Sequence, residues 1–203
     1  MGVTVSLMSF SESLAVRPEQ SGDRDAVLRV IADAFGDHGE HVADIWASIG
    51  RHRRGSLVAE LGGRVVGHVG LSEAWVDARR ALVDVWELSP LSVQTDLQGQ
   101  GIGTTLLAAA VEVSRGSGAP VLFLEGSPHY YGPRGFERAD RRGFLPASLE
   151  RTPRAAFQCV VFEGWEDWMT GQLIYPSVWW EHDAAGLRDP RLSDLEERFA
   201  SLE

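Results

Sequence analysis

The 203-residue sequence contains no lysine, so all 19 of its basic residues are arginine. Its single cysteine, Cys159, excludes a disulfide framework and a cysteine-rich zinc site, and it suits a reducing compartment. No apolar run near the N-terminus is long enough for a signal peptide or a membrane span. The six histidines show no paired ligand spacing. These absences predict a cytoplasmic protein with no metal and no membrane partner.

The net charge of −10 argues against nucleic acid as a partner, because phosphate backbones require a basic surface. Much of this charge lies in residues 163–203, where ten acidic residues stand against three arginines. Such a surface attracts cationic small molecules, or it is simply a solvated face with no further role. Both interpretations remain open.

Length and composition predict one globular domain, because 203 residues with 44% hydrophobic content can bury a full core. We expect residues 1–15 to form a loose leader, residues 16–162 the core, and residues 163–203 an acidic, tryptophan-rich extension packed on that core. Apolar periodicity predicts helices over residues 23–35, 41–51 and 104–114. It predicts strands over residues 16–18, 57–61, 64–71, 82–93 and 121–125.

Three glycines at alternate positions, Gly99, Gly101 and Gly103, follow an apolar strand and open directly into the helical run 104–114. Glycine lets backbone amides turn toward a common point, because it has no Cβ and adopts positive φ easily. The first turn of a helix adds unpaired N–H groups and a partial positive charge. The segment therefore predicts a cradle for a phosphate or pyrophosphate group.

The spacing of this loop distinguishes among phosphate-binding motifs. A dinucleotide fingerprint places its third glycine where this chain has Thr104, and a P-loop requires a lysine that the chain lacks. The pattern present is Gln98-x-x-Gly101-x-Gly103, preceded by Pro-Leu-Ser-Val at residues 90–93. It resembles the acyl-coenzyme-A loop of the GNAT superfamily of N-acetyltransferases.

A second match follows the apolar strand 121–125. Tyr131, Gly135 and Phe136 resemble the Tyr-x-x-x-Gly-Phe segment of the same superfamily. The distance between the two motifs leaves room for one helix and one strand, as the family has it. The resemblance covers roughly residues 16–162 and is closest to a compact bacterial branch of acetyltransferases.

This resemblance implies an α/β (α+β) fold with a mixed, mostly antiparallel central sheet flanked by helices. In that fold the strands over residues 82–93 and 121–125 are parallel and splay apart to admit the acyl-coenzyme-A arm. Pro90 agrees with this, because proline cannot donate to a ladder and so requires a break or a bulge. The implied cosubstrate is acetyl-CoA, without a metal, and its implied contacts are Leu91, Ser92 and Val93 for the arm and Gln98, Gly99, Gln100, Gly101, Ile102, Gly103 and Thr104 for the pyrophosphate.

Two residues are candidates for catalysis. Tyr131 lies where the family has its general acid, and a phenol of pKa about 10 is matched to a departing thiol. Its alternative is an aromatic that only packs after the strand. Glu87 lies six residues before Val93, where some members of the superfamily carry a catalytic base. A water chain, or a carboxylate that is only hydrogen-bonded on its strand, is the alternative there.

Other polar residues are weaker candidates. His68 alternates with valines in a strand and is structural or lines the site. Cys159 is expected in the core, where it does not act as an acyl-carrying nucleophile. Arg134 reaches a coenzyme phosphate or faces solvent.

The resemblance implies an enzyme that transfers an acetyl group from acetyl-CoA to an amine by direct attack. The alternative is a non-catalytic GNAT-fold sensor or partner module that binds acyl-CoA. A dinucleotide oxidoreductase is more distant, because the loop spacing does not fit. The acceptor remains open among small amines, antibiotics, amino acids, polyamines and peptide termini, as do its cationic character and a homodimeric state.

Overall fold

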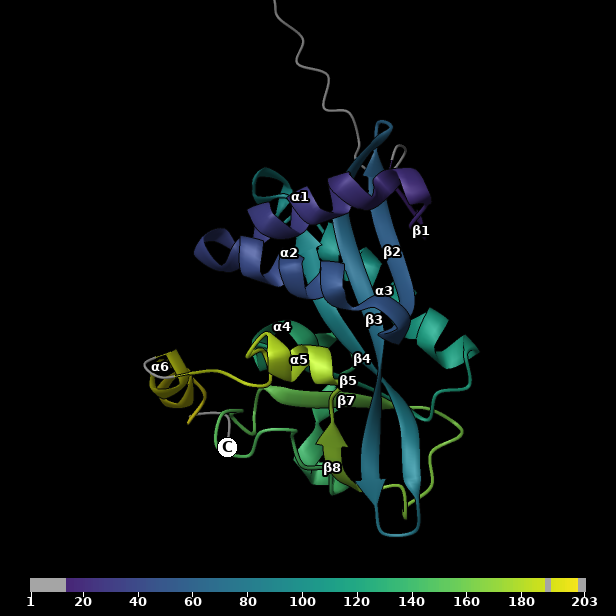
Figure 1. Cartoon of the computed structure of the whole chain (residues 1–203), viewed down its shortest axis with the longest axis vertical. Coiled ribbons are helices and arrows are strands. Elements are labelled where there is room, and N and C mark those ends of the chain that lie inside the picture. Colours follow the sequence, from purple (N-terminus) through teal and green to yellow (C-terminus); the bar gives the residue numbers. More distant parts are fainter. Residues whose placement is uncertain (1–13, 189–190, 201–203) are drawn as a thin grey trace, which may run out of the picture.

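The computed structural model describes residues 14–188 and 191–200, and there a mixed sheet is flanked by helices (Figure 1). The strands are β1 Leu14–Pro18, β2 Arg53–Leu61, β3 Arg64–Ala78, β4 Leu82–Val93, β5 Val121–Glu125, β6 Glu137–Arg138, β7 Phe157–Val161 and β8 Gly171–Ile174. The helices are α1 Arg24–Ala34, α2 Gly39–Ser48, α3 Ile102–Gly116, α4 Pro128–Tyr131, α5 Ser177–Glu181 and α6 Arg191–Phe199. The sheet order is β1-β2-β3-β4-β5-β7-β6, with β8 paired to β3.

The predicted fold class is confirmed: β4 and β5 are parallel, and every other strand pair of the described residues is antiparallel. Most of the predicted leader, residues 1–13, lies outside the described residues. Leu14 and Ala15, which the prediction also gave to the leader, belong to β1 instead, because they pair with β2. Residues 189–190 and 201–203 of the predicted extension also lie outside the described residues.

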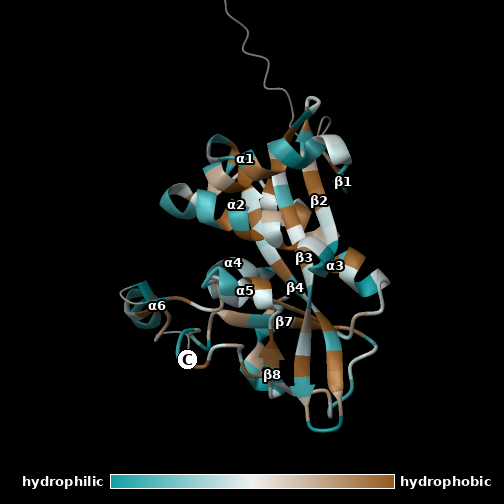
Figure 2. Cartoon of the chain, viewed as in Figure 1, coloured by the Kyte–Doolittle hydropathy of each residue, from teal (hydrophilic) through white to brown (hydrophobic). Residues whose placement is uncertain are grey.

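Helices cover the two faces of the sheet, and two hydrophobic clusters lie between the layers. Along β5, Val121 and Phe123 belong to the cluster that includes residues of α1, α2 and α5. Leu122 and Leu124 belong to the cluster under α3. Successive side chains of a strand point to opposite faces, so this alternation assigns each cluster to one face. Hydrophobic residues recur along β3, β4 and β8, while α6 is mainly hydrophilic (Figure 2).

The parallel pair β4–β5 is short. Its described residue pairs are Trp86 with Leu122 and Glu87 with Phe123. Beyond these two pairs the strands diverge, and β5 pairs with β7 on its other edge. The splayed parallel pair predicted from the sequence is therefore present.

A bulge in β4 lies next to this divergence. Leu88 pairs with Leu71 and Leu91 pairs with Val69, so the two residues Ser89 and Pro90 stand opposite Gly70 alone. The Ser89–Pro90 peptide bond is cis. Such an inserted residue bends the strand and redirects its backbone groups. Pro90 therefore marks a bulge, as the sequence predicted.

The C-terminal segment contributes a strand to the sheet. β8 pairs with β3 over four residues from Trp75 to Ala78. β3 continues to Ala78, well beyond the predicted end at residue 71, because it pairs with β4 as far as Asp77 and with β8 as far as Ala78. Tyr175 and Trp179, which follow β8, are buried in the cluster on the α1, α2 and α5 face. Trp180 is exposed.

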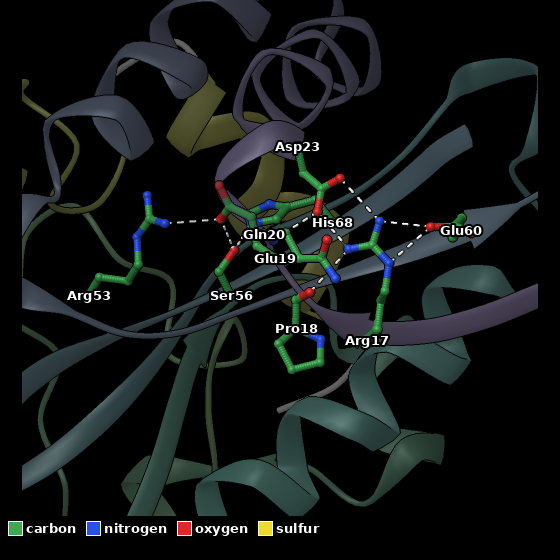
Figure 3. Close-up of polar contacts among 9 residues, drawn as sticks. All are labelled: Arg17, Pro18, Glu19, Gln20, Asp23, Arg53, Ser56, Glu60 and His68. Atoms are coloured by element: carbon green, nitrogen blue, oxygen red, sulfur yellow. Dashed lines mark hydrogen bonds and ion pairs between the residues drawn. The ribbon is translucent and has the colours of Figure 1, made fainter. Parts of the chain in front are cut away.

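Charged contacts fasten β1 and the start of α1 to the sheet (Figure 3). The Arg17 guanidinium lies 2.6 Å from the Asp23 carboxylate and 2.7 Å from that of Glu60 on β2. The Glu19 carboxylate accepts hydrogen bonds from Arg53 and from the Ser56 hydroxyl. These contacts lie away from the diverging strands, so they position the sheet edge.

Gly70 tests the bulge, because a Cβ there would lie 2.7 Å from the Ser89 carbonyl oxygen and would also overlap the Trp46 ring. We predict that Gly70→Ala lowers the free energy of unfolding by about 1–3 kcal/mol, the usual cost of overpacking. Urea unfolding measures the change. Gly22→Ala is the matched control, since nothing lies within 4 Å of a Cβ at Gly22. Equal stability of the two variants would contradict the described packing.

Candidate active site

A cavity of about 480 Å³ opens where the end of β4, the start of α3 and α4 meet. It lies over the gap left by the divergence of β4 from β5. Its lining residues are Leu91, Val93, Leu97, Gln98, Gly99, Gly101, Ile102, Gly103, Thr104, Ser127, Tyr130, Tyr131 and Arg134. Most of the residues predicted to bind the coenzyme are thus brought together in one place.

The glycine loop has the backbone geometry that a phosphate cradle requires. Gly99 and Gly101 have φ values of 76° and 89°, a region that favours glycine. Within α3 the first intrahelical bond runs from the Thr105 N–H to the Gly101 carbonyl, at 3.0 Å. The preceding N–H groups, from Ile102 to Thr104, are those that a helix leaves without an intrahelical acceptor. Together with the helix dipole they form an anion site on the cavity wall.

Gly103 is also required by close packing. A Cβ at this position would lie 2.7 Å from the Tyr130 hydroxyl oxygen, which leaves no room for a side chain. The loop backbone can therefore approach a ligand more closely than a residue with a side chain would allow. The residues present fit a pyrophosphate group.

Arg134 supplies positive charge beside this cradle. Its Nε donates to the Thr104 hydroxyl at 3.0 Å, and its guanidinium lies 4.0 Å from the centroid of the Tyr130 ring. Both contacts hold the cation at the start of α3, facing the cavity. The solvent-facing alternative for Arg134 is therefore not what the structure has.

Three of the predicted coenzyme contacts differ from the rest. The Ser92 side chain is buried away from the cavity, because its neighbours Leu91 and Val93 occupy the lining face of the strand. Gln100 is exposed and does not line the cavity. Gln98 does line it, but its side-chain amide donates to the Val93 carbonyl at 3.1 Å. Gln98 thus fixes the turn between strand and loop.

Tyr131 lines the same cavity from α4. Its ring packs against Gly126, where a Cβ would overlap the ring, and against Phe136 at a centroid distance of 5.8 Å. Burial, followed by the neighbouring Tyr130, raises the pKa of the Tyr131 phenol. The phenol is therefore protonated and able to donate at neutral pH.

A second cavity, of about 340 Å³, lies beside the first on the other side of the diverging strands. Ser127 lines both cavities, so they meet at the C-terminal end of β5. The residues lining the second cavity are Glu87, Ser89, Glu125, Gly126, Ser127, Pro153, Ala156, Tyr175, Trp179, Ala184, Gly186, Leu187, Leu195, Arg198 and Phe199.

Glu87 lies in the second cavity and not with the coenzyme loop. Its side chain is buried, and Oε2 has no hydrogen-bond partner among the described residues. Burial, followed by the negative charge of Glu125, raises the pKa of Glu87 well above its ordinary value. The Tyr175 and Ser72 hydroxyls oppose this shift more weakly. Glu87 is therefore one half of a buried carboxyl pair.

Glu125, the other half of the pair, was not identified from the sequence. The Tyr175 hydroxyl donates to its Oε1 at 2.9 Å, and the Thr152 hydroxyl lies 3.3 Å from its Oε2. Burial raises the pKa of Glu125 to about 7. An acidic residue at the end of an otherwise apolar strand was the available signal. Sequence alone did not show that it shares a face with Glu87.

His68 and Cys159 line neither cavity. His68 is buried, its Nε2 lies 2.9 Å from the Ser56 hydroxyl, and burial lowers its pKa to about 3 (Figure 3). It is a neutral structural residue. Cys159 is buried too, and burial raises the pKa of its thiol to about 12. It is a core residue, as predicted, because a reactive cysteine needs a thiolate.

Two features are absent from the described residues, 14–188 and 191–200. These residues contain no helix that is long and apolar enough to cross a membrane. No group of three or more histidine, cysteine, aspartate or glutamate side chains there could hold a metal ion.

The fold and the loop define an acetyltransferase of the GNAT type, and comparison with known proteins agrees. Residues 24–136, more than half of the chain, match the Acetyltransferase (GNAT) family. The chain belongs to this family. The family predicted from the glycine loop and the Tyr131 motif is therefore confirmed.

Individual relatives show the same likeness. The uncharacterized N-acetyltransferase YjhQ of Escherichia coli is 31% identical over 119 residues, which are 57% of this chain and 65% of YjhQ. A GNAT family acetyltransferase from Brucella melitensis, solved in complex with acetyl-CoA, is 26% identical with a TM-score of 0.66, covering 82% of this chain and 97% of that one. YhbS of Escherichia coli, solved in complex with CoA, shares the fold at 21% identity and a TM-score of 0.72, covering 82% and 92%.

Gly103→Asp tests the phosphate cradle. The new side chain puts bulk against Tyr130 and a negative charge among the loop amides, so we predict that it abolishes binding of CoA. Titration calorimetry measures the affinity. Gln100→Glu is the control, because it adds the same charge to the same loop outside the cavity. Unchanged CoA affinity in a folded Gly103→Asp variant would place the coenzyme elsewhere.

The raised pKa of Glu125 predicts that the free energy of unfolding falls as pH rises. The folded protein keeps a proton on this carboxyl up to about pH 7, whereas the unfolded chain releases it above the ordinary value of 4.5. The charged or titratable groups that act on it are Glu87, Tyr175 and Arg151.

We therefore expect Glu125→Gln to flatten the decline in unfolding free energy between about pH 5 and pH 8, by on the order of 1–3 kcal/mol. Urea unfolding across this range measures the difference between the two proteins. Glu112→Gln, on the exposed side of α3, should follow the wild-type slope. Parallel curves for wild type and Glu125→Gln would contradict the predicted protonation.

Proposed function

We propose that this member of the family transfers an acetyl group from acetyl-CoA to an amine by direct attack. The observation that carries the proposal is the junction of two cavities at Ser127. The first holds a phosphate cradle and the second holds buried carboxyls. Acetyl-CoA supplies an activated thioester, and the fit of its pyrophosphate to the Gly99–Thr104 loop would leave the reactive end at the junction.

The buried carboxyls supply the base in this proposal. An amine attacks only when it is neutral, so an ammonium that enters the second cavity must first lose a proton. Glu125, with its pKa raised to about 7, is matched to this task near neutral pH. Glu87, whose pKa is also raised, belongs to the same buried pair, so proton uptake and release are properties of the two carboxyls together. The sequence predicted Glu87 alone as the base, and this proposal assigns the role to Glu87 and Glu125 together.

Tyr131 supplies the acid. The bond between the acetyl carbon and sulfur breaks, and the departing thiolate needs a proton. Tyr131 lines the first cavity, and its hydroxyl makes no hydrogen bond to another described residue, so it is free to donate. Its raised pKa keeps the proton in place until the thiolate forms.

The second cavity also favours an enzyme over a sensor. A protein that only binds acyl-CoA requires the first cavity. It gains nothing from two buried carboxyls, which cost folding free energy unless they have a function.

Replacing Tyr131 with phenylalanine keeps the ring and removes the proton donor. We predict that kcat for acetyl transfer falls roughly 10²–10⁴-fold, the usual scale for a positioned acid. Release of free thiol from acetyl-CoA, in the presence of a panel of amines, measures the rate. The melting temperature and the affinity for CoA should stay close to those of the wild type.

Tyr130→Phe is the matched control. Tyr130 belongs to the same helix and lines the same cavity, but its hydroxyl lies against Gly103 at the loop. We expect it to affect coenzyme affinity more than kcat. If Tyr131→Phe keeps full kcat, or if Tyr130→Phe loses more of it, the acid is not Tyr131.

A further inference from the structure

We propose that the acceptor is a primary monoamine with an apolar body, whose far end is uncharged or anionic and remains at the mouth of the second cavity. This inference rests on the proposed acetyl transfer and specifies which amines the site takes. It follows from how charge and apolar surface are distributed from the floor of that cavity to its mouth.

The floor of the cavity is anionic. Glu87 and Glu125 lie on the same face of neighbouring strands, and Tyr175 from the C-terminal segment donates to Glu125. Oε2 of Glu87 is buried without a hydrogen-bond partner among the described residues, although it belongs to a cavity-lining side chain. A buried polar atom of this kind is costly unless a ligand satisfies it. An ammonium group supplies the donors and the charge that it lacks.

The negative charge on the floor is limited, because the two carboxyls there are close together and buried. Burial raises the pKa of both carboxyls, and each negative charge opposes the other, so the pair carries less than two full negative charges. One ammonium is neutralised there. A second ammonium on the same ligand would have to find its partner elsewhere.

The walls are apolar. Trp179 of α5 and Leu195 and Phe199 of α6 line the middle of the cavity, together with Leu187 and Ala156. These side chains offer no hydrogen-bonding partner to a hydroxylated or multiply charged ligand, apart from the Trp179 indole N–H, which is buried. Burying an apolar body here removes apolar surface from water, which favours binding. Sugars and aminoglycosides are therefore poor fits.

One arginine, Arg198, is among the residues that line the second cavity, whereas the acidic residues of α6 are not. Arg198 lines the cavity from α6 and is exposed, with no ion pair to another described residue. At this position it repels a second ammonium and attracts a carboxylate. This local charge opposes the net charge of −10 of the whole chain, which by itself would favour polyamines. The cavity thus discriminates against diamines at its entrance.

Three five-carbon amines test the inference with acetyl-CoA at about pH 8, where exposed carboxylates and arginines are charged. Pentylamine, δ-aminovalerate and cadaverine share one chain and differ only at the far end. We expect kcat/KM for pentylamine and for δ-aminovalerate to exceed that for cadaverine by about tenfold or more. Calorimetry of each amine with the protein gives the binding constants without turnover.

Arg198→Glu reverses the charge at the mouth on an exposed position, where it should not disturb folding. We expect it to reduce the preference for δ-aminovalerate over cadaverine by about tenfold or more, with KM for acetyl-CoA unchanged. Arg191→Glu is the matched control, because Arg191 is exposed on the same helix but does not line the cavity. It should leave the preference intact.

The outcomes separate this inference from the proposed function. Acetylation of cadaverine at a kcat/KM equal to or above that of pentylamine overturns the monoamine class and leaves acetyl transfer standing. Binding of pentylamine without turnover of any amine supports the cavity assignment and overturns the enzyme. If neither pentylamine nor δ-aminovalerate binds or reacts, the monoamine assignment is wrong. A preference that Arg198→Glu and Arg191→Glu change equally overturns the role of Arg198.

Discussion

The divergence of β4 from β5 is the constraint on which the rest of the site depends. Two residue pairs hold the strands together, and the bulge opposite Gly70 then turns the end of β4 away. A sheet that opened at this point without a ligand would leave backbone groups unpaired, so the opening is useful only as a binding slot. The glycine loop forms one side of this slot and α4 the other. Both cavities exist because the strands separate here.

The carboxyl pair shows how the fold tolerates polar groups beneath an apolar helix layer. Two ionised carboxylates at close range inside a protein would repel strongly and lose their hydration. A shared proton removes most of this cost, and hydroxyl groups of Tyr175 and Thr152 lie at Glu125. The same arrangement of carboxyls and hydroxyls that allows Glu125 to be buried also brings its pKa close to neutrality. The tolerated burial of Glu125 and its raised pKa thus have one physical origin.

Local sequence patterns identified the residues that line the first cavity better than those that line the second. The backbone conformations at Gly99, Gly101 and Pro90 could be predicted from the sequence. The freedom of glycine and the missing N–H of proline act within a few residues. β8 was missed, since four residues of mixed polarity become a strand only through pairing with the distant β3. Glu125 was missed for a similar reason. The role of Glu125 depends on a hydrogen bond from Tyr175, which lies fifty residues further along the chain.

The region matched by the family ends at residue 136, two residues after Arg134, the last residue that lines the first cavity. The loop, α4 and the diverging strands lie within the matched region, whereas most of the acceptor wall comes from residues after it, including Tyr175 and Trp179. The linings of the two cavities therefore draw on different parts of the chain. A changed C-terminal segment would present a new acceptor wall to an unaltered coenzyme slot, so one inherited reaction can be redirected among substrates.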